Sequence, residues 1–346
     1  MNHHEKYMAR CITLALKGAG NVAPNPMVGA VLVHDNRIIG EGYHQEYGSA
    51  HAEVNCFASI APEDENLIKD AVLYVSLEPC AHVGKTPACS NLIIQKGVKK
   101  VVIGCRDPFE AVNGQGIEQL KMAGIEVLEN VFNQECLELN RRFFTFHLLK
   151  RPYIILKWAQ TADGKIAAND NRRLYISNAV SNTLVHRWRT EESGILIGTN
   201  TAIKDNPALT NRLWEGKPPL RLVIDTRLQL SSNQQLMSDG LPVVIYNFLR
   251  DHHSGPVIYK QVREDRDLLL QILQDCFERN LLSIIVEGGA NLLQQFIDAG
   301  LWDEARVITN SQLFVGEGLS APLLHNGIIF EEINWSDDQL VCYRRL

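Results

Sequence analysis

The 346-residue sequence contains no uninterrupted apolar run of roughly 18 residues, the length that a membrane-spanning helix needs. Residues 1–7 also lack the layout of a secretory signal peptide, in which positive charges precede an apolar segment. We therefore expect a cytoplasmic protein that has no membrane partner.

Positive charge and aromatic side chains are also in short supply. Lysine and arginine number 34 against 40 aspartates and glutamates, the formal net charge is −6, and aromatic residues make up 7%. Proteins that bind nucleic acid commonly present basic surfaces with interleaved aromatic side chains. The composition therefore gives no reason to expect a nucleic-acid partner, although local basic residues could still bind a small anionic substrate.

Cysteines are few: the chain has eight, and they are irregularly spaced. Such spacing in a chain of this length does not match the disulfide framework of a small secreted protein. We expect reduced thiols that are free to bind metal. The length and the hydrophobic content of 45% are sufficient for two globular domains, each with its own core.

The segment from His51 to Cys89 carries the strongest chemical signal. Glu53 lies two residues after His51, and Pro79-Cys80 is followed nine residues later by Cys89. One imidazole and two thiolates make three zinc ligands, which leaves the fourth tetrahedral position open for water, as in catalytic sites. Glu53 is close enough to transfer protons without binding the metal. This is the pattern of zinc deaminases that act on nucleobase rings, although their cysteines are spaced C-x-x-C.

Two other interpretations apply to the same residues. Free cysteine is among the most buried residue types, so a histidine and two cysteines can simply belong to a core. His82 could instead complete the site as a fourth ligand, which would make the zinc structural. We interpret His82 as a substrate contact or as a residue that positions a ligand. The order and spacing of the motifs favour a catalytic zinc.

Hydrophobic periodicity in the first half alternates between that of helices and that of strands. It predicts helices at 5–17, 51–61, 90–96, 116–123 and 133–149, and strands at 30–33, 37–41, 72–77, 101–105 and 125–128. His51 and Cys89 then begin helices, where partial positive charge favours a thiolate over a thiol. The alternation predicts a three-layer α/β domain.

Four motifs in this half resemble the deaminase domain of the RibD family of bifunctional riboflavin-biosynthesis proteins. They are Asn25-Pro26-x-Val28-Gly29, Gly42-x-His44, His51-Ala52-Glu53 and Pro79-Cys80-x-His82-x-Gly84-Lys85-Thr86-Pro87-x-Cys89. The resemblance implies a cytidine-deaminase-like domain with zinc ligands at His51, Cys80 and Cys89 and proton transfer by Glu53. The implied substrate-facing residues are Asn25, His44, Lys85 and Thr86.

The hydrophobic period changes near residues 149–152, which predicts one domain at 1–149 and a second at 152–346. In the second half we expect strands at 153–158, 194–198, 220–225, 242–246, 256–262 and 283–286, and helices at 182–190, 267–279 and 290–299. Residues 200–210 are expected to form a polar loop outside the core. Asp163-Gly164 is a turn signal that by itself indicates only a hairpin.

Glu287-Gly288-Gly289 follows a predicted strand and precedes a predicted helix, an arrangement that can seat a phosphate. By itself this is weak evidence, because a glycine pair after a strand is usually a tight turn. Other motifs precede it in the order Thr161-x-Asp163-Gly164-Lys165, Thr199-Asn200-Thr201 and Asp205-Asn206-Pro207-x-Leu209-Thr210-x-Arg212. In this order the motifs resemble the reductase domain of the same family, a relative of dihydrofolate reductase. The resemblance therefore covers essentially the whole chain.

This second resemblance implies an NADPH site and a site for a phosphorylated substrate. The implied NADPH contacts are Ala159, Tyr175, Thr201, Asp205, Thr226, Gly289, Ala290, Asn291, Leu292, Leu293, Gln294 and Gln295. The implied substrate contacts are Arg173, Arg189, Leu209, Arg212 and Glu287. An arginine can bind phosphate in bidentate fashion, which suits Arg189 and Arg212. Many members have Trp in place of Tyr175 and Ser in place of Arg173, so the resemblance is weaker at these two positions.

The resemblance implies two consecutive steps of riboflavin biosynthesis. Zinc-dependent hydrolysis deaminates 2,5-diamino-6-ribosylamino-4(3H)-pyrimidinone 5′-phosphate, and NADPH then reduces the ribosyl group to ribityl. Three alternatives remain open: a deaminase with a decayed reductase domain, a nucleic-acid base deaminase with a binding module, and a structural zinc protein. A homo-oligomer, either dimer or tetramer, is a further expectation from the family.

Overall fold

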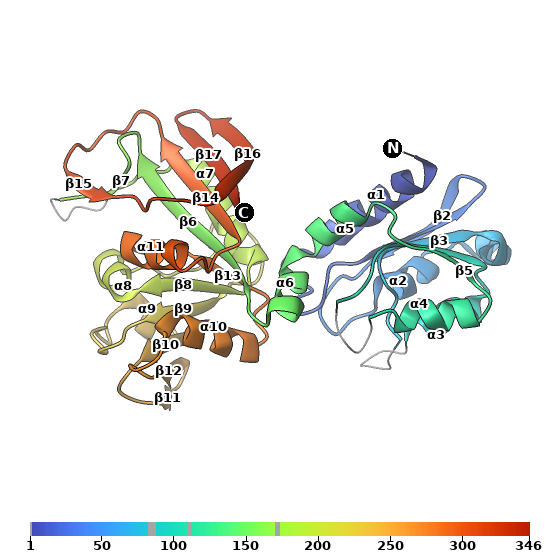
Figure 1. Ribbon diagram of the computed structural model, residues 1–346, viewed down its shortest axis with the longest axis horizontal. Coiled ribbons are helices and arrows are strands. Elements are labelled where there is room, and N and C mark those ends of the chain that lie inside the picture. The colour runs from blue at the N-terminus through green and yellow to red at the C-terminus, as the bar shows by residue number, and fades with distance from the viewer. Residues whose placement is uncertain (1, 82–87, 109–112, 170–173) are drawn as a thin grey trace. The chain divides into compact units, whose positions relative to one another are not determined.

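The computed structural model describes residues 2–81, 88–108, 113–169 and 174–346. The chain divides into two compact units, Met1–Lys150 (unit 1) and Arg151–Leu346 (unit 2), which are drawn in Figure 1. None of the helices in the described ranges is long and apolar enough to span a membrane.

Unit 1 is built on a five-stranded sheet in the order β2-β1-β3-β4-β5. β1 pairs antiparallel with β2 and β3, whereas β3, β4 and β5 run parallel. The strands are β1 (Gly29–His34), β2 (Arg37–Tyr43), β3 (Val72–Leu77), β4 (Lys100–Cys105) and β5 (Glu126–Leu128).

Helices cover both faces of this sheet because side chains along a strand alternate between the two faces. Leu73 and Val75 of β3 share a core with α2 (Ala52–Ala58), α3 (Cys89–Lys96) and α4 (Gln115–Met122). Tyr74 points to the opposite face, into the core shared with α1 (His3–Ala15) and α5 (Asn133–Leu139). The predicted three-layer α/β arrangement is confirmed. Two short 3₁₀ helices, Leu16–Gly18 and Pro62–Asp70, complete unit 1.

The single helix predicted at 133–149 is wrong, since two helices meet at Asn140. α5 ends at Leu139, and α6 (Arg141–Leu149) begins immediately after Asn140. The buried Asn140 amide accepts a hydrogen bond from the Met27 N–H and donates one to the Met27 carbonyl, both at 2.8 Å. These bonds hold the Asn140 side chain against another segment of the chain. The helix breaks at the residue that makes them.

Unit 2 is built on a ten-stranded sheet in the order β11-β12-β10-β9-β8-β13-β6-β14-β17-β16. The strands from β12 to β14 in this order are parallel, and the outer pairs are antiparallel. A separate pair joins β7 to β15. The strands are β6 (Tyr153–Thr161), β7 (Lys165–Ala168), β8 (Gly194–Gly198), β9 (Leu220–Ile224), β10 (Val243–Asn247), β11 (His252–Ser254), β12 (Val257–Gln261), β13 (Ser283–Val286), β14 (Glu304–Asn310), β15 (Gly318–Ser320), β16 (Gly327–Trp335) and β17 (Asp338–Arg345).

Helices again lie on both faces of the large sheet (Figure 1). α10 (Leu268–Glu278) and α11 (Ala290–Asp298) share one core with Ile154 and Leu156 of β6. α7 (Ala179–Glu191), α8 (Thr199–Asp205) and α9 (Gln235–Ser238) pack on the opposite core, which contains Tyr153 and Ile155. Both units are therefore α/β, as the sequence predicts.

The prediction of a polar loop outside the core at residues 200–210 is wrong for its first half, and it is also wrong for Leu209, which is buried in the core. Residues 199–205 form α8, and Ala202 in that helix is completely buried in the core. The only apolar residues in this segment are Ala202 and Ile203. Two adjacent apolar residues are too few to show the periodicity of a helix. Packing against β8 and β9 stabilises this short helix, and packing is what usually decides helix formation at such lengths.

Candidate functional site

Three potential metal ligands converge in unit 1 from three separate segments. His51 is the N-cap residue of α2, Cys80 lies in the loop after β3, and Cys89 is the first residue of α3. The Nδ1 atom of His51 lies 3.7 Å from Cys80 Sγ and 3.3 Å from Cys89 Sγ. All three ligand atoms lie within 4.8 Å of one another. The structure thus brings together the residues that the sequence predicts as a metal site.

The charges of these groups show why a cation suits the site. A hydrogen bond from the Cys89 thiol lowers the pKa of Cys80 to about 4, with a further contribution from His51. The same contact with Cys80 raises the pKa of Cys89, and burial adds to this effect. Without a cation, therefore, only one of the two sulfurs readily carries charge. One imidazole nitrogen and two sulfurs form a donor set that fits zinc, because the bound metal stabilises both thiolates.

The start of α3 fixes the position of Cys80. The Cys89 N–H donates to Cys80 Sγ at 3.4 Å, and the Ser90 N–H donates to the Cys80 carbonyl at 3.2 Å. The Ser90 hydroxyl lies 3.1 Å from that carbonyl and 2.7 Å from Gln119 Oε1. Cys80 is therefore held by the backbone of the helix that carries the other cysteine.

Glu53 lies in the first turn of α2, two residues after His51. Its side chain is buried, and this burial raises its pKa, as does the charge of Cys80 to a smaller extent. The hydrogen bond with Cys80 raises the pKa of His51. The carboxyl group is thus placed beside the three ligands on the same short helix as His51.

Asn25 and His44, both predicted to face the substrate, contact each other beside this site. Asn25 Nδ2 lies 3.1 Å from His44 Nε2, and His44 Nδ1 lies 3.0 Å from the Ala50 carbonyl. Burial lowers the pKa of His44, which favours the neutral ring. The simplest assignment of the protons has Nδ1 donating to Ala50 and Nε2 accepting from the Asn25 amide. The His44 and His51 rings are 5.4 Å apart between centroids.

The sequence did not single out Glu78, a buried residue that binds backbone N–H groups after β4 and at the start of α4. Its carboxylate accepts hydrogen bonds of 3.0–3.4 Å from the backbone N–H groups of Asp107, Gly114, Gly116 and Ile117. A Cβ atom on Gly116 would lie 1.9 Å from the Pro79 carbonyl oxygen, so this close approach requires glycine. The signal that could have found Glu78 is a carboxylate directly after a buried strand.

In unit 2 the side chains of Arg189 and Glu287 form a bidentate pair. Arg189 Nε donates to Glu287 Oε1 at 2.8 Å, and Arg189 Nη2 donates to Oε2 at 2.7 Å. Arg189 Nη1 also donates to the Thr210 carbonyl at 2.9 Å. The Glu287 side chain is only 7% exposed. The guanidinium face predicted to bind phosphate is thus directed at a carboxylate of the protein.

Lys157 of β6 is a member of this cluster that the sequence reasoning missed. Its Nζ atom lies 4.0 Å from Glu287 Oε2, and burial lowers the pKa of this lysine. Burial would raise the pKa of Glu287, but the positive charges of Arg189 and Lys157 lower it to about 2. The signal that could have indicated Lys157 is a lone lysine within an apolar strand.

The predicted NADPH contacts lie along the carboxyl ends of neighbouring parallel strands. Thr201 is in α8 after β8, Thr226 follows β9, and Gly289 follows β13 as the N-cap residue of α11. Gly289 has φ +60°, and a Cβ on it would lie 3.4 Å from Thr201 Oγ1. Ligands of open α/β sheets bind outside the carboxyl ends of the strands. The remaining predicted contacts here are Ala159 at the end of β6, Asp205 in α8, and Ala290, Asn291, Leu292, Leu293, Gln294 and Gln295 in α11.

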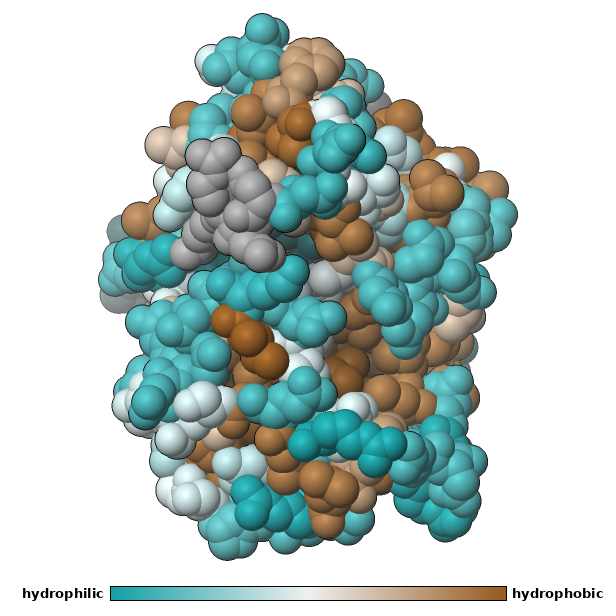
Figure 2. Space-filling model, turned by 90° about the vertical axis from the view of Figure 1, so that its left-hand side faces the viewer, coloured by the Kyte–Doolittle hydropathy of each residue, from teal (hydrophilic) through white to brown (hydrophobic). Residues whose placement is uncertain are grey.

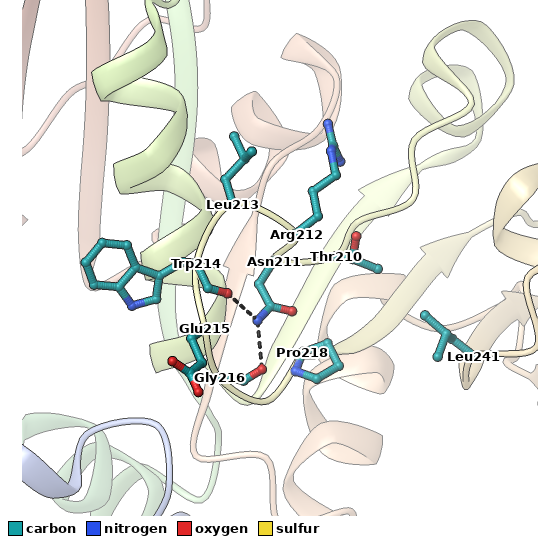
Figure 3. A pocket seen from close by; sticks show the side chains of 9 residues that line it. All are labelled: Thr210, Asn211, Arg212, Leu213, Trp214, Glu215, Gly216, Pro218 and Leu241. Carbon is teal, nitrogen blue, oxygen red and sulfur yellow. Dashed lines mark hydrogen bonds between the residues drawn. The ribbon is translucent and has the colours of Figure 1, made fainter.

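Leu209 and Arg212 lie in the segment that follows α8. Leu209 is buried with φ +55°, a left-handed conformation that is unusual for leucine. Arg212 lines an open cavity of about 630 Å³, shown in Figure 3. The cavity residues are Thr210, Asn211, Arg212, Leu213, Trp214, Glu215, Gly216, Pro218 and Leu241.

Polar and apolar side chains are mixed on the face of the molecule that Figure 2 presents.

Four predicted substrate contacts, His82, Lys85, Thr86 and Arg173, lie outside the described residues. Tyr175 is described, and its side chain is 77% exposed.

Two family models match the chain, one in each half. The model of the cytidine and deoxycytidylate deaminase zinc-binding region matches residues 1–105. The model of the RibD C-terminal domain matches residues 152–340, which is more than half of the chain.

Similar proteins extend over nearly the whole chain. A riboflavin biosynthesis protein RibD from Aquifex aeolicus is 38% identical over 91% of this chain and 89% of its own length. A diaminohydroxyphosphoribosylaminopyrimidine deaminase/5-amino-6-(5-phosphoribosylamino)uracil reductase from Thermotoga maritima is 36% identical, and its crystal structure superposes with a TM-score of 0.90 over 100% of both chains. A RibD structure from Acinetobacter baumannii, 28% identical, gives 0.89 over 99% of both.

These similarities cover the reductase half as fully as the deaminase half, and they give no support to a decayed reductase. The chain belongs to the RibD family and is a bifunctional enzyme of riboflavin biosynthesis, with a zinc-dependent deaminase activity and an NADPH-dependent reductase activity.

Proposed function

We propose that unit 1 deaminates 2,5-diamino-6-ribosylamino-4(3H)-pyrimidinone 5′-phosphate and that unit 2 then reduces the ribosyl group of the product to ribityl. The deaminase activity of unit 1 is assigned from one observation, the convergence of His51, Cys80 and Cys89 beside Glu53. The reductase activity of unit 2 is supported by the charged cluster around Glu287 at the carboxyl end of β13. The product would be 5-amino-6-ribitylamino-uracil 5′-phosphate.

In the deaminase site, His51 Nδ1 and the sulfurs of Cys80 and Cys89 would hold the zinc ion. Zinc bound there supplies an open coordination position and lowers the pKa of a water molecule towards neutrality. The Glu53 carboxyl group takes a proton from the attacking water and gives it to the departing amine. Its position in the first turn of α2, whose N-cap residue is the ligand His51, supports this role.

Asn25 and His44 are proposed to contact the pyrimidine ring. The two side chains hold each other, and the Ala50 carbonyl also holds His44, so neither side chain needs to reorganise when substrate enters. The neutral ring of His44 suits an uncharged heterocycle. His82, Lys85 and Thr86 are proposed as further substrate contacts from the family pattern.

In the reductase site, NADPH would lie along the carboxyl ends of β6, β8, β9 and β13. NADPH bound there supplies hydride to C1′ of the ribosyl group. The proposed cofactor contacts are the residues at these strand ends, with Tyr175. Thr201 and Gly289 lie side by side, which supports a single cofactor site built from α8 and α11.

The ribosyl phosphate is proposed to bind beside the Arg189–Glu287 pair. Lys157, Arg189 and Arg212 carry three positive charges against the single negative charge of Glu287. This excess favours a phosphorylated substrate. Arg189 keeps Glu287 ionised and oriented, while Arg212 lines the open cavity and is free of that pairing. Leu209 and Arg173 are the other proposed substrate contacts.

The test uses purified, zinc-loaded protein given the diaminopyrimidine ribosyl phosphate, with and without NADPH. Ammonia release and NADPH oxidation are followed in one sample. We expect ammonia without NADPH, and oxidation of NADPH only after deamination. Ammonia release with no NADPH oxidation would contradict the NADPH and substrate contacts proposed in unit 2. NADPH oxidation before any ammonia release would reverse the proposed order.

We also propose that the chain is a cytoplasmic homo-oligomer, a dimer or tetramer, that assembles through unit 2. β16 is the outermost strand at one edge of the large sheet, and Ile328, Ile329 and Phe330 in it are 49%, 57% and 41% exposed. An apolar edge strand commonly pairs with another strand. Light scattering tests this, because Ile329→Asp should dissociate the assembly, and a monomeric wild-type protein would contradict it.

A further inference from the structure

His186 lies in α7, three residues before Arg189, and has no role in the steps described above. Its side chain is only 5% exposed. Within the described part of the chain, no hydrogen-bond partner reaches its buried Nδ1 atom. Buried polar atoms in folded proteins are nearly always hydrogen-bonded. The Nδ1 atom therefore indicates a partner that the described residues do not provide.

The groups around His186 are those of the proposed reductase substrate site. Burial, and then the positive charges of Arg189 and Arg212, lower the pKa of His186 to about 4, whereas Glu287 acts in the opposite direction. Lys157 contributes a smaller lowering. The spacing of three residues places His186 on the same face of α7 as Arg189. Near neutral pH this imidazole is uncharged, with one donor and one acceptor nitrogen.

The chemistry of this cluster indicates which part of the substrate meets His186. The positive groups already suit the phosphate, and a phosphate oxygen at neutral pH mainly accepts hydrogen bonds. A hydroxyl group both donates and accepts, so it satisfies the Nδ1 atom in either tautomer of a neutral ring. The proposed substrate carries hydroxyl groups on the ribosyl carbons between its phosphate and its pyrimidine ring.

We propose that His186 is a substrate-binding residue of the reductase site and that its Nδ1 atom hydrogen-bonds a ribosyl hydroxyl group. This inference rests on the proposed binding of the ribosyl phosphate beside the Arg189–Glu287 pair. His186 then recognises the sugar, and the neighbouring cations recognise the phosphate.

The first test compares His186→Leu with His186→Asn in the zinc-loaded full-length protein. In NADPH oxidation with deaminated substrate, His186→Leu should raise KM about 3- to 10-fold, the effect of losing one neutral hydrogen bond. His186→Asn keeps a polar atom near the position of Nδ1 and should stay within about twofold of wild type. The exposed His253→Leu serves as the matched control and should leave KM unchanged.

Two further measurements separate substrate binding from a structural role. The Kd of NADPH, followed by tryptophan fluorescence, should not change in His186→Leu. Its thermal midpoint should equal or exceed that of wild type, because leucine leaves no buried polar atom without a partner. A structural role would instead lower the midpoint and leave KM unchanged, and that result would overturn the inference.

Competitive inhibitors distinguish the sugar from the phosphate. His186→Leu should weaken inhibition by ribose 5-phosphate about 3- to 10-fold but leave inhibition by inorganic phosphate unchanged. Arg212→Gln should weaken both. Equal weakening of both inhibitors in His186→Leu would make this residue a phosphate contact and overturn the proposal.

Glu287→Gln distinguishes the failure of this inference from the failure of the proposed function. If Glu287→Gln leaves the substrate KM unchanged, the substrate binds elsewhere and both proposals are wrong. If Glu287→Gln raises KM while His186→Leu retains the wild-type value, only the inference about His186 is wrong.

Discussion

The candidate sites of units 1 and 2 compensate buried charge in different ways. In unit 1, two sulfurs and an imidazole nitrogen face one another, and the contact with Cys80 raises the pKa of Cys89. In unit 2, the buried Glu287 carboxylate is paired with Arg189 and lies near Lys157. The first site therefore needs an added cation, whereas the second compensates its carboxylate internally and retains an excess of positive charge.

The two sites also differ in how far apart their residues lie in the sequence. His51 and Cys89 are 38 residues apart, and both belong to one recognisable set of motifs. Arg189 and Glu287 are 98 residues apart and meet only because α7 packs near the end of β13. Because the first site is a set of metal ligands and the second is a buried charge cluster, mutations should affect the first through metal loss and the second through uncompensated charge.

The largest effect is expected for Cys89→Ala. Removal of one of three protein ligands should abolish zinc binding and reduce deamination more than about 1,000-fold, a greater loss than the 10–100-fold typical of residues that only orient ligands. Zinc content and ammonia release measure this. NADPH oxidation with deaminated substrate should persist, because the reductase site is in unit 2.

Cys136→Ala is the matched control, since Cys136 is a buried thiol of the same unit outside the metal set. It should keep both zinc and deamination. Loss of both activities in Cys89→Ala would contradict two independent sites.

Glu287→Gln should have the next largest effect, and it should be confined to unit 2. The substitution leaves Arg189 and Lys157 buried without their counter-charge, which should destabilise unit 2 by about 3–5 kcal/mol. All tryptophans of the chain lie in unit 2, so their fluorescence reports its unfolding selectively; they are Trp158, Trp188, Trp214, Trp302 and Trp335. Zinc-dependent ammonia release should remain at the wild-type rate.

The exposed pair of Arg263 and Asp265 gives the control for this change. Asp265→Asn should leave the tryptophan unfolding midpoint essentially unchanged, because exposed ion pairs contribute little. Equal midpoints for Glu287→Gln and Asp265→Asn would show that Glu287 is not a compensating charge.

Acid should weaken unit 2 through the same carboxylate. The neighbouring cations lower the pKa of Glu287 in the folded state to about 2, despite its burial, from an ordinary value of 4.5. A pKa that is lower in the folded state stabilises the fold above pH 4.5, and this contribution is lost as the pH falls from 4.5 towards 2. The loss should be roughly 3 kcal/mol in wild type. Urea unfolding followed by tryptophan fluorescence should show a smaller acid dependence in Glu287→Gln.

Glu78→Gln should have the smallest effect of these substitutions. Glu78 is a buried carboxylate bonded to backbone N–H groups rather than to cations. Glutamine keeps one acceptor oxygen but adds donors that face other donors, so we expect unit 1 to lose about 1–3 kcal/mol. Hydrogen exchange at Gly114 and Gly116 should accelerate. Unchanged hydrogen exchange at Gly114 and Gly116 would show that Glu78 does not hold these two backbone N–H groups.

Glu126→Gln is the control for Glu78, because Glu126 is an exposed partner of Lys100 in the same unit. It should leave exchange at both glycines unchanged.

The elements that the sequence predicted well are those with a strong local pattern. β3 at 72–77, β8 at 194–198 and β13 at 283–286 have the predicted ends, because each is a short apolar run between polar residues. The predictions of one helix at 133–149 and of a polar loop at 200–210 were wrong where tertiary contacts overrode the local pattern. Asn140 is hydrogen-bonded to the Met27 backbone, and Ala202 in the short helix α8 is buried in the core. The strands that went unpredicted are β7, β11, β14, β15, β16 and β17.

The sequence alone determined the chemistry of the metal site and the α/β class of both units. A His-x-Glu motif with two later cysteines identifies donor types without reference to any long-range contact, and strand and helix periods depend only on neighbouring residues. Tertiary structure decided which charges are paired. Arg189 reaches Glu287, Lys157 lies beside that pair, and Glu78 binds the backbone N–H group of Gly114, because packing brings these segments together. The energy of a buried charge depends on its neighbours in space, which the order of residues does not specify.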